Sequence, residues 1–338
     1  MPLEFRKEDG RLVWVRNPFN GDVMYFTDIH RKRSGFRPRD PAQVPDWEEA
    51  RAARMAELEA ARRNCPFCPG NESLTMEEVL RVPAPEAVAG EADPRPWRLR
   101  AFYNIVPRVP ESCTGGRNES YVVVEDPRHF ADGARHHDDL IYTALLGFEH
   151  FQAILQADLA VARLSRANPA VASVLIRKNQ GRESGASQPH VHNQVIGCDR
   201  ELPPVLRERE ALAREPDLWG QILDFAEHEG FLVESRAGCH LYFSPFGVFP
   251  RSYEVVVPDV SCCITDLEPA RLEAFAALLY RALEILGPLP LDYEIHDGPS
   301  VPLHAHVNAR HYPYSNIGGT LNLPANILGT FRRDRSTG

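Results

Sequence analysis

Residues 187–194 read SQPHVHNQ, and this stretch decides how the rest of the chain is interpreted. Side chains two residues apart lie on one face of a β-strand, so His190, His192 and Gln194 are expected to point together. Two histidines that merely satisfy hydrogen bonds in a half-polar strand are the alternative. For an isolated His-x-His pattern that alternative is the commoner one.

A polar segment with two glycines leads into this strand. Residues 179–187 read NQGRESGAS and include Asn179, Gly181, Gly185 and Ser187. Glycines let the backbone approach a ligand closely, and backbone N–H groups of such a loop can cradle phosphate oxygens. We therefore expect these residues to bind substrate, and the loop and strand together favour a site at which a phosphoryl group is attacked.

Cysteine usage indicates a second kind of site. Residues 65–72 read CPFCPGNE, so Cys65 and Cys68 place two thiols in one tight turn. Such a pair is a common half of a tetrahedral zinc site, and two buried or redox-active cysteines are the alternative. The chain has seven cysteines, an odd number, which does not indicate a framework of disulfides.

One pattern of elements occurs twice. In each copy a Ser-Tyr pair opens an apolar strand, and an amphipathic helix, a strand and a His-x-His strand follow. The first copy comprises residues 120–124, about 138–164, 173–177 and 190–194; the second comprises residues 252–257, about 266–286, 291–295 and 304–306. This repetition predicts duplication of one α+β module.

Shorter signals complete the expected layout. Residues 11–26 are typical of short strands around a turn at 17–22, and residues 46–62 of a surface helix. The basic stretch 31–38 is expected to be a loop, and the proline-rich residues 83–97 a connection.

Length, charge and hydropathy restrict the function. The 338 residues suffice for two domains or one large duplicated domain. A net charge of −9 argues against a nucleic-acid surface and favours small ligands. Without an apolar stretch near the roughly 18 residues of a membrane span, or a signal peptide at the start, the expected location is the cytoplasm.

The pattern Asn-x-Gly-x-x-x-Gly-x-Ser-x-Pro-His-x-His-x-Gln resembles the active-site signature of the galactose-1-phosphate uridylyltransferase family, a branch of the histidine-triad superfamily. The resemblance implies that His192 attacks the α-phosphorus of a nucleoside diphosphate sugar. A sugar 1-phosphate then leaves a covalent nucleotidyl-histidine, and an acceptor phosphate takes the nucleotidyl group. Gln194 would orient the phosphoryl group, and Ser187 would bind the departing phosphate.

The glutamine has a chemical consequence. Hydrolase branches of the superfamily commonly have a third histidine at the position of Gln194, and a neutral amide cannot act as a general acid. A sugar phosphate leaves without a proton, so Gln194 suits transfer between phosphates and suits hydrolysis poorly.

The resemblance also implies two metal sites. Each joins residues that are distant in sequence. The zinc site would be formed by Cys65, Cys68, His129 and His190; a second divalent metal, iron or zinc, would be held by Glu208, His296, His304 and His306. A duplicated strand whose histidines have lost metal binding is the alternative for the second set.

Further substrate contacts follow from the resemblance. Arg31 or Arg33 would contact nucleotide phosphate or ribose, although a solvated basic loop is the alternative. Asn104, in Phe-Tyr-Asn, would read the base or ribose. Asn322 stands where the family has a glutamate that helps to hold the hexose, so the sugar and the base stay open.

The expected fold is therefore α+β, with two tandem histidine-triad-like halves, 1–200 and 201–338, each an antiparallel sheet with a packed helix. By resemblance the chain would form a homodimer. The expected function is nucleotidyl transfer between a nucleotide sugar and a sugar 1-phosphate. A nucleotide-sugar or dinucleotide phosphorylase that uses inorganic phosphate, a nucleotide hydrolase, and a regulator that only binds nucleotide are the alternatives.

Overall fold

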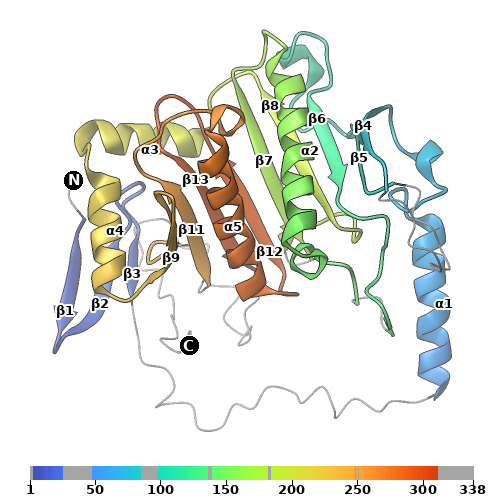
Figure 1. Cartoon of the computed structure of the whole chain (residues 1–338), viewed down its shortest axis with the longest axis horizontal. Helices are drawn as coiled ribbons and strands as arrows, with labels where there is room; N and C mark the ends of the chain where they lie inside the picture. The colour runs from blue at the N-terminus through green and yellow to red at the C-terminus, as the bar shows by residue number, and fades with distance from the viewer. Residues whose placement is uncertain are drawn as a thin grey trace. The chain divides into compact units, whose positions relative to one another are not determined.

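The computed structural model describes residues 3–25, 48–84, 97–135, 139–181, 184–247, 249 and 251–310. Figure 1 shows the helices and strands of the chain. By their contacts they divide into two compact units. The first unit comprises residues 44–201 and 283–294; the second comprises 1–43, 202–282 and 295–338. One change of unit falls after residue 201, and the division into halves 1–200 and 201–338 stays a prediction. The N-terminal strands, however, belong to the second unit, and residues 283–294 to the first.

The first unit is built around antiparallel strands in the order β4-β5-β6-β8-β7. In chain order its elements are α1 (Glu48–Asn64), the short 3-10 helix η2 (Glu72–Leu74), β4 (Glu78–Val82), β5 (Leu99–Tyr103), η3 (Glu111–Cys113), β6 (Ser120–Val124), η4 (Thr143–Leu146), α2 (Phe148–Arg166), β7 (Ser173–Gln180) and β8 (His192–Cys198). The strand β12 (Leu291–His296) begins in this unit, and its last two residues belong to the second.

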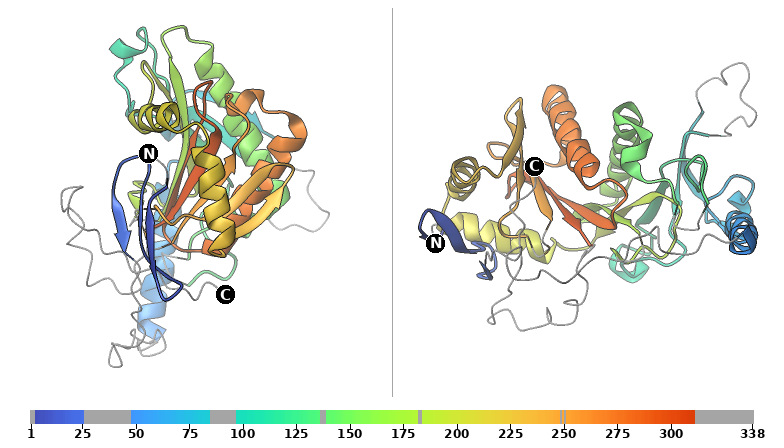
Figure 2. Two further views of the ribbon diagram at one scale, coloured as in Figure 1. Left: turned by 90° about the vertical axis from the view of Figure 1, so that its left-hand side faces the viewer. Right: turned by 90° about the horizontal axis from the view of Figure 1, so that it is seen from below.

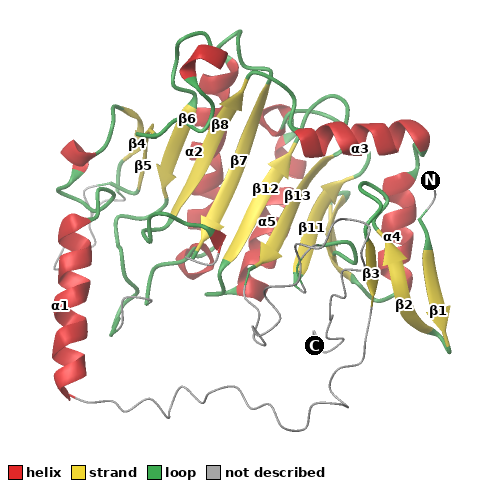
Figure 3. Cartoon of the chain, turned by 180° about the vertical axis from the view of Figure 1, so that it is seen from behind, coloured by secondary structure: helices red, strands yellow, loops and turns green. Residues whose placement is uncertain are grey.

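Helix α2 covers one face of β7 and β8, as the side-on views show (Figure 2). Asn193 of β8 donates a hydrogen bond to Asp158 of α2, so its side chain lies on the covered face. Because side chains alternate along a strand, His192 and Gln194 lie on the face directed away from α2. Figure 3 views β7 and β8 from that side, with α2 behind them.

That second face is covered by the turn that carries the cysteines. The turn and the strands below it form one buried apolar cluster. Its members are Cys65, Phe67, Cys68, Trp97, Phe102, Val122 and Val124. The strand β6 is buried along its whole length because it has a cover on both faces, which explains its run of valines.

The second unit repeats this plan with a different cover. Its antiparallel strands follow the order β13-β11-β10-β9, and a separate small sheet has the order β1-β2-β3. In chain order the elements are β1 (Phe5–Glu8), β2 (Arg11–Arg16), β3 (Val23–Tyr25), α3 (Pro203–Arg214), α4 (Leu218–His228), β9 (Leu232–Arg236), β10 (Cys239–Phe243), β11 (Ser252–Val257), η6 (Ile264–Asp266), α5 (Pro269–Leu286) and β13 (Leu303–Ala309). The end of α5, from residue 283, belongs to the first unit. An apolar cluster joins α3, α4 and β2 to Tyr242 and Val256 of the strands.

The α+β class, the antiparallel strands and the repeated order of elements confirm the expected fold. The turn at 17–22 and the surface helix are also present, the latter as α1. The helix expected from about residue 138 starts only at Phe148, because a 3-10 turn and Gly147, with φ +86°, precede it. Strands β4, β5, β9 and β10 and helices α3 and α4 were not expected from the sequence.

A buried ion pair holds the first unit together beneath the histidine strand. Lys178 of β7 binds Glu125, and the two side chains are 1% and 0% exposed. Glu125 also accepts a hydrogen bond from Thr143 at 2.7 Å, and the Lys178 ammonium lies 3.4 Å from the backbone oxygen of His192. The pair therefore links β7, β8 and the segment after β6.

Removing one member of this pair should be costly, because the other would remain as a buried, unpaired charge. We predict that Lys178→Met lowers the free energy of unfolding by about 3–5 kcal/mol in denaturant titrations. The matched control is Lys7→Met, whose ion pair with Glu229 is partly exposed and should contribute no more than about 1 kcal/mol. Equal losses in the two variants would contradict a special role for the buried pair.

Candidate active site and metal centres

His192 is the first residue of β8 and presents one defined nitrogen. Its Nδ1 donates a hydrogen bond to the backbone oxygen of His190 at 2.8 Å, so the lone pair is on Nε2. The side chain is 5% exposed, and burial lowers its pKa to about 4. The imidazole is therefore neutral at neutral pH, which a nucleophilic nitrogen requires.

Gln194 shares the face of His192 and lies opposite Val122 of β6. It is 7% exposed. The intervening Asn193 donates hydrogen bonds on the other face, at 2.7 Å to Asp158 and at 2.8 Å to Tyr293. These buried contacts hold the backbone of β8, and hence the two side chains on its opposite face.

The glycine segment is held by its own hydrogen bonds. The Asn179 side chain donates to the Ser184 backbone oxygen and accepts from Arg177 at 2.7 Å, so it braces the loop from inside. Gly181 has φ +80°, and a Cβ there would lie 3.0 Å from Pro290, so this position needs glycine. Gly185 also has a positive φ, +85°.

The other predicted substrate contacts differ in what the structure describes of them. Ser187 is exposed between the loop and β8. Asn104 is partly buried at the end of β5, where its side-chain oxygen accepts a hydrogen bond from the N–H of Val106 at 3.2 Å. Arg31, Arg33 and Asn322 lie outside the described residues.

Four side chains of the first unit converge on one point. Cys65, Cys68, His129 and His190 are buried, and their ligand atoms lie within 4.8 Å of one another. The sulfur-to-nitrogen distances are 3.7 Å for Cys65 to His190, 3.3 Å for Cys68 to His129 and 3.5 Å for Cys68 to His190. A tetrahedron with metal–ligand bonds of about 2.1–2.3 Å has edges of about 3.6 Å, so the donor set fits such a cation.

Hydrogen bonding in this cluster favours one thiolate, because the contact between the two cysteines raises the pKa of Cys68 while it lowers that of Cys65. The hydrogen bond from Cys68 holds the pKa of the Cys65 thiol well below its usual range, and the His129 and His190 rings act in the same direction. His190 Nε2 donates to the backbone oxygen of Asp126 at 2.7 Å, which leaves Nδ1 directed at the sulfurs. A hydrogen bond of this kind orients a metal-binding histidine.

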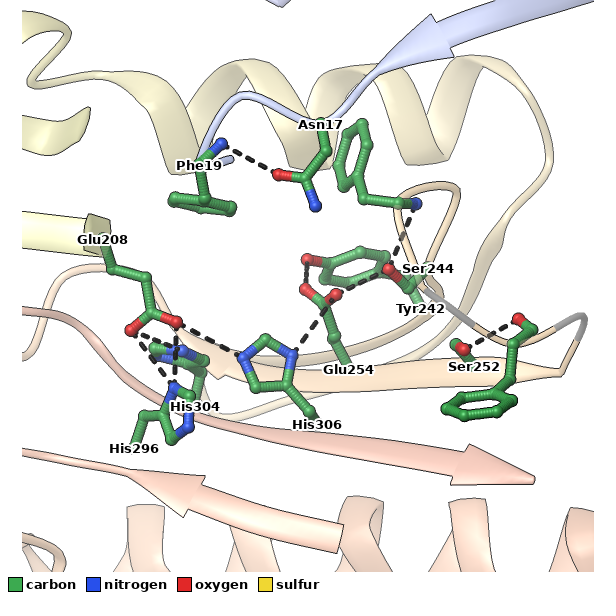
Figure 4. A network of polar contacts seen from close by, with 12 residues as sticks. Asn17, Phe19, Glu208, Tyr242, Ser244, Ser252, Glu254, His296, His304 and His306 are labelled. Carbon is green, nitrogen blue, oxygen red and sulfur yellow. Dashed lines mark hydrogen bonds and ion pairs between the residues drawn. The ribbon is translucent and has the colours of Figure 1, made fainter. Parts of the chain in front are cut away.

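A second convergence occurs in the second unit (Figure 4). Its members lie on α3, β12 and β13. They are Glu208, His296, His304 and His306, with ligand atoms within 4.8 Å of one another. The Glu208 carboxylate lies 2.9 Å from His296 Nδ1, 3.4 Å from His304 Nε2 and 3.5 Å from His306 Nε2. Burial lowers the pKa of His306, but hydrogen bonds to Glu208 and Glu254 outweigh it and raise the pKa to about 10.

Strand register shows which residues of the two copies correspond. The Ser-Tyr pairs open β6 and β11. Four residues after each serine, Val124 of β6 pairs with His192 of β8, and Val256 of β11 pairs with His304 of β13. His304, like His192, donates from Nδ1 to the backbone oxygen two residues earlier, here at 2.7 Å. His304 thus occupies the place of His192, and His306 that of Gln194. Alignment of the two His-x-His patterns alone would pair His306 with His192, which is wrong by two residues.

Three described residues near these sites were not predicted from the sequence. Phe67 packs edge-on against His192, with ring centroids 5.3 Å apart. Glu254 faces His306, and Lys178 lies beneath β8. The signals were present: Phe67 stands between the two cysteines, and a glutamate interrupts the apolar run of β11 where β6 has valine.

Comparisons with known proteins agree with this architecture. A family model described as "Domain of unknown function (DUF4921)" matches residues 109–258. An ADP-glucose phosphorylase of Arabidopsis thaliana is 24% identical over 264 residues, which span 70% of this chain and 68% of that protein.

Two solved structures share the fold. The crystal structure of an ADP-glucose phosphorylase from Arabidopsis thaliana with bound ADP-glucose has a TM-score of 0.62 and 18% identity, covering 92% of this chain and 90% of that chain. A uridylyltransferase structure has a TM-score of 0.54 and 22% identity, covering 88% and 86%. The chain therefore has the fold of these proteins, as the signature at residues 179–194 predicts. Among the described helices, none has the length and apolar character that crossing a bilayer demands.

The cysteine cluster leads to a direct prediction. Cys65→Ser should remove one metal ion per chain and lower the unfolding temperature, because a structural metal stabilises the fold that binds it. Metal content by plasma emission spectrometry and thermal unfolding would measure both. Cys198→Ser changes a partly buried thiol outside the cluster and is the control. Metal content and stability equal to wild type in Cys65→Ser would contradict the site.

Proposed function

We propose that the chain is a nucleotidyltransferase that works through a covalent nucleotidyl group on His192. One observation carries the proposal: His192 is a neutral imidazole whose Nδ1 is engaged by the backbone, so Nε2 alone is available as a nucleophile. The likeness of fold to an ADP-glucose phosphorylase and a uridylyltransferase supports it.

The reaction would proceed in two displacements. In the first, the Nε2 lone pair attacks the α-phosphorus of a nucleoside diphosphate sugar, and the bond to the bridging oxygen breaks. The sugar 1-phosphate leaves with that electron pair, and the imidazole carries the nucleotidyl group. In the second, an oxygen of an acceptor phosphate attacks the same phosphorus and regenerates His192. The His190 carbonyl, which accepts the Nδ1 proton, would stabilise the positive charge on the ring.

Gln194 supports transfer over hydrolysis. Its amide can donate a hydrogen bond to the phosphoryl oxygens but cannot supply a proton to a leaving group. Ser187 and the backbone N–H groups of the glycine segment would bind the phosphates, with Gly181 and Gly185 providing the required backbone conformations. Asn104, Arg31 and Arg33 remain proposed nucleotide contacts.

Inorganic phosphate is the acceptor that the relatives favour. The protein that is 24% identical and the structure with TM-score 0.62 are both ADP-glucose phosphorylases. We therefore propose ADP-glucose and phosphate as the first substrates to test, with ADP and glucose 1-phosphate as products. A sugar 1-phosphate acceptor is the second candidate, since a uridylyltransferase shares the fold. The homodimer and the cytoplasmic location stay predictions.

We assign zinc to the cluster of Cys65, Cys68, His129 and His190, because two thiolates and two imidazoles suit that ion. Zinc would tie the cysteine turn to the strand of the nucleophile. Iron or zinc would suit the carboxylate and three imidazoles of the second cluster. The proposed chemistry does not pass through either ion.

Partial exchange tests the covalent mechanism. With ADP-glucose and isotope-labelled glucose 1-phosphate but no phosphate, label should enter ADP-glucose, because the first displacement is reversible without an acceptor. His192→Asn should abolish the exchange, while His240→Asn, which changes a histidine of β10 far from the nucleophile in sequence, should retain it. Unchanged exchange in His192→Asn would contradict the role of His192. The absence of exchange by the wild-type protein, together with turnover to ADP when phosphate is added, would instead indicate direct displacement.

Phe67 should position the nucleophile. Its ring contacts His192, and in the sequence Phe67 stands between the proposed metal ligands Cys65 and Cys68. We therefore expect Phe67→Ala to lower the exchange rate about 10- to 100-fold through misplacement of the imidazole. Phe243→Ala is the control, because that ring is equally buried, at 7% exposure, in the second unit. Each deletion should cost about 3–5 kcal/mol of stability. Equal exchange rates in the two folded variants would show that Phe67 only packs.

A further inference from the structure

A row of polar side chains crosses three strands of the second unit. Tyr242 of β10 pairs with Glu254 of β11, and Glu254 pairs with His306 of β13. Paired residues on neighbouring strands project from the same face of a sheet, so the three side chains form a line. The line ends at Glu208 of α3, whose carboxylate lies 3.5 Å from His306 Nε2 (Figure 4).

Glu254 is held in one orientation within this row. It is 5% exposed and accepts hydrogen bonds from the hydroxyl of Tyr242 and, at 2.5 Å, from that of Ser244. One of its oxygens lies 3.5 Å from His306 Nδ1. The two hydroxyl donors fix the carboxylate, and the carboxylate in turn faces one particular nitrogen of the imidazole.

The residues around Glu208 fit a divalent cation. The three distances from its carboxylate to the imidazole nitrogens, 2.9, 3.4 and 3.5 Å, resemble the edges of a coordination polyhedron with bonds of about 2.1 Å. His304 is already oriented, since its Nδ1 donates to the Pro302 carbonyl at 2.7 Å and leaves Nε2 toward Glu208. For His306, the Glu254 carboxylate takes the place of such a backbone acceptor.

We propose that Glu254 is a positioning residue of the second metal centre. It accepts the Nδ1 proton of His306, so that the Nε2 lone pair faces Glu208 and a divalent transition metal bound there. An outer carboxylate of this kind fixes the tautomer of a metal-binding histidine and makes the histidine a stronger ligand. The inference concerns the second unit alone and does not depend on the reaction proposed for His192.

The duplication supports this role independently. At the position of Glu254 the first unit has Val122, and at the position of His306 it has Gln194. The amide of Gln194 has no ring proton that needs an acceptor, and its partner on the adjacent strand, Val122, is apolar. The imidazole of His306 does need an acceptor for its Nδ1 proton, and its partner on the adjacent strand, Glu254, is a carboxylate. The two positions thus differ together in the way that a change from phosphoryl binding to metal binding requires.

Cobalt titration of the full-length protein tests the proposal. Metal-free protein would be titrated with Co²⁺ against a competing chelator, and the visible spectrum would separate the two centres. Binding to the cysteine cluster gives a thiolate-to-cobalt charge-transfer band, and binding to the histidine cluster does not. Glu254→Gln keeps the size of the side chain but removes its charge. The matched control is Glu119→Gln, a buried carboxylate of the first unit that binds Tyr121 and Asn168.

In Glu254→Gln, the affinity of the centre without the charge-transfer band should fall about 10- to 100-fold, while the thiolate band stays at wild-type strength. Glu119→Gln should change neither. Because Glu254 acts through His306, adding Glu254→Gln to His306→Ala should cause no further loss. Wild-type affinity in Glu254→Gln, additive losses in the double variant, or a wild-type protein that binds Co²⁺ only at the cysteine cluster would each overturn the proposal. The last outcome would mean that His306 is a protonated imidazolium between two carboxylates.

A milder pair of changes covers the case in which Glu254→Gln does not fold. Tyr242→Phe and Ser244→Ala each remove one hydroxyl that orients the carboxylate and leave the carboxylate in place. Each should weaken the same centre by less than the direct substitution, again with the thiolate band unchanged. Unaltered affinity in the combined Tyr242→Phe/Ser244→Ala variant would overturn the positioning role.

Discussion

The hydrogen bond from His192 Nδ1 to the backbone oxygen of His190 is the contact on which the proposed chemistry depends. It joins a side chain to the strand two residues earlier, so the strand conformation itself selects the nitrogen that faces outward. Burial then keeps the imidazole neutral. Three sets of contacts hold that strand. They are the buried Lys178–Glu125 pair, the hydrogen bonds of Asn193 on the face toward α2, and the packing of the cysteine turn on the other face.

The same contact recurs in the second unit with a different outcome. His304 donates to the Pro302 carbonyl as His192 donates to His190, but its Nε2 faces Glu208. The difference lies in what covers the strands. In the first unit a turn with two cysteines covers that face, and in the second the helices α3 and α4 do. One folding pattern therefore places an imidazole beside the cysteine turn in one copy and opposite the Glu208 carboxylate in the other.

Local patterns in the sequence predicted the duplicated order of elements, the face shared by His192 and Gln194, and the cysteine pair. The remaining members of the two clusters are distant in sequence, and only the family resemblance predicted them. The elements that the sequence missed depend on long-range packing. Helix α3 carries Glu208 within a run of charged residues, and the placement of the N-terminal strands with the second unit follows from contacts of Leu12 and Val15 across the chain. The correspondence of His304 with His192 required the strand register, which the His-x-His pattern alone does not contain.

The most direct test of the central claim is to locate the nucleotidyl group on the protein. The wild-type chain would be incubated with ADP-glucose without an acceptor, digested under alkaline conditions that preserve a phosphorus–nitrogen bond, and analysed by tandem mass spectrometry. The account predicts the mass of one adenylyl group on His192, lost when phosphate is added before digestion. An adenylyl group on another residue, such as His190 or His304, or turnover of ADP-glucose with no modified peptide, would contradict it.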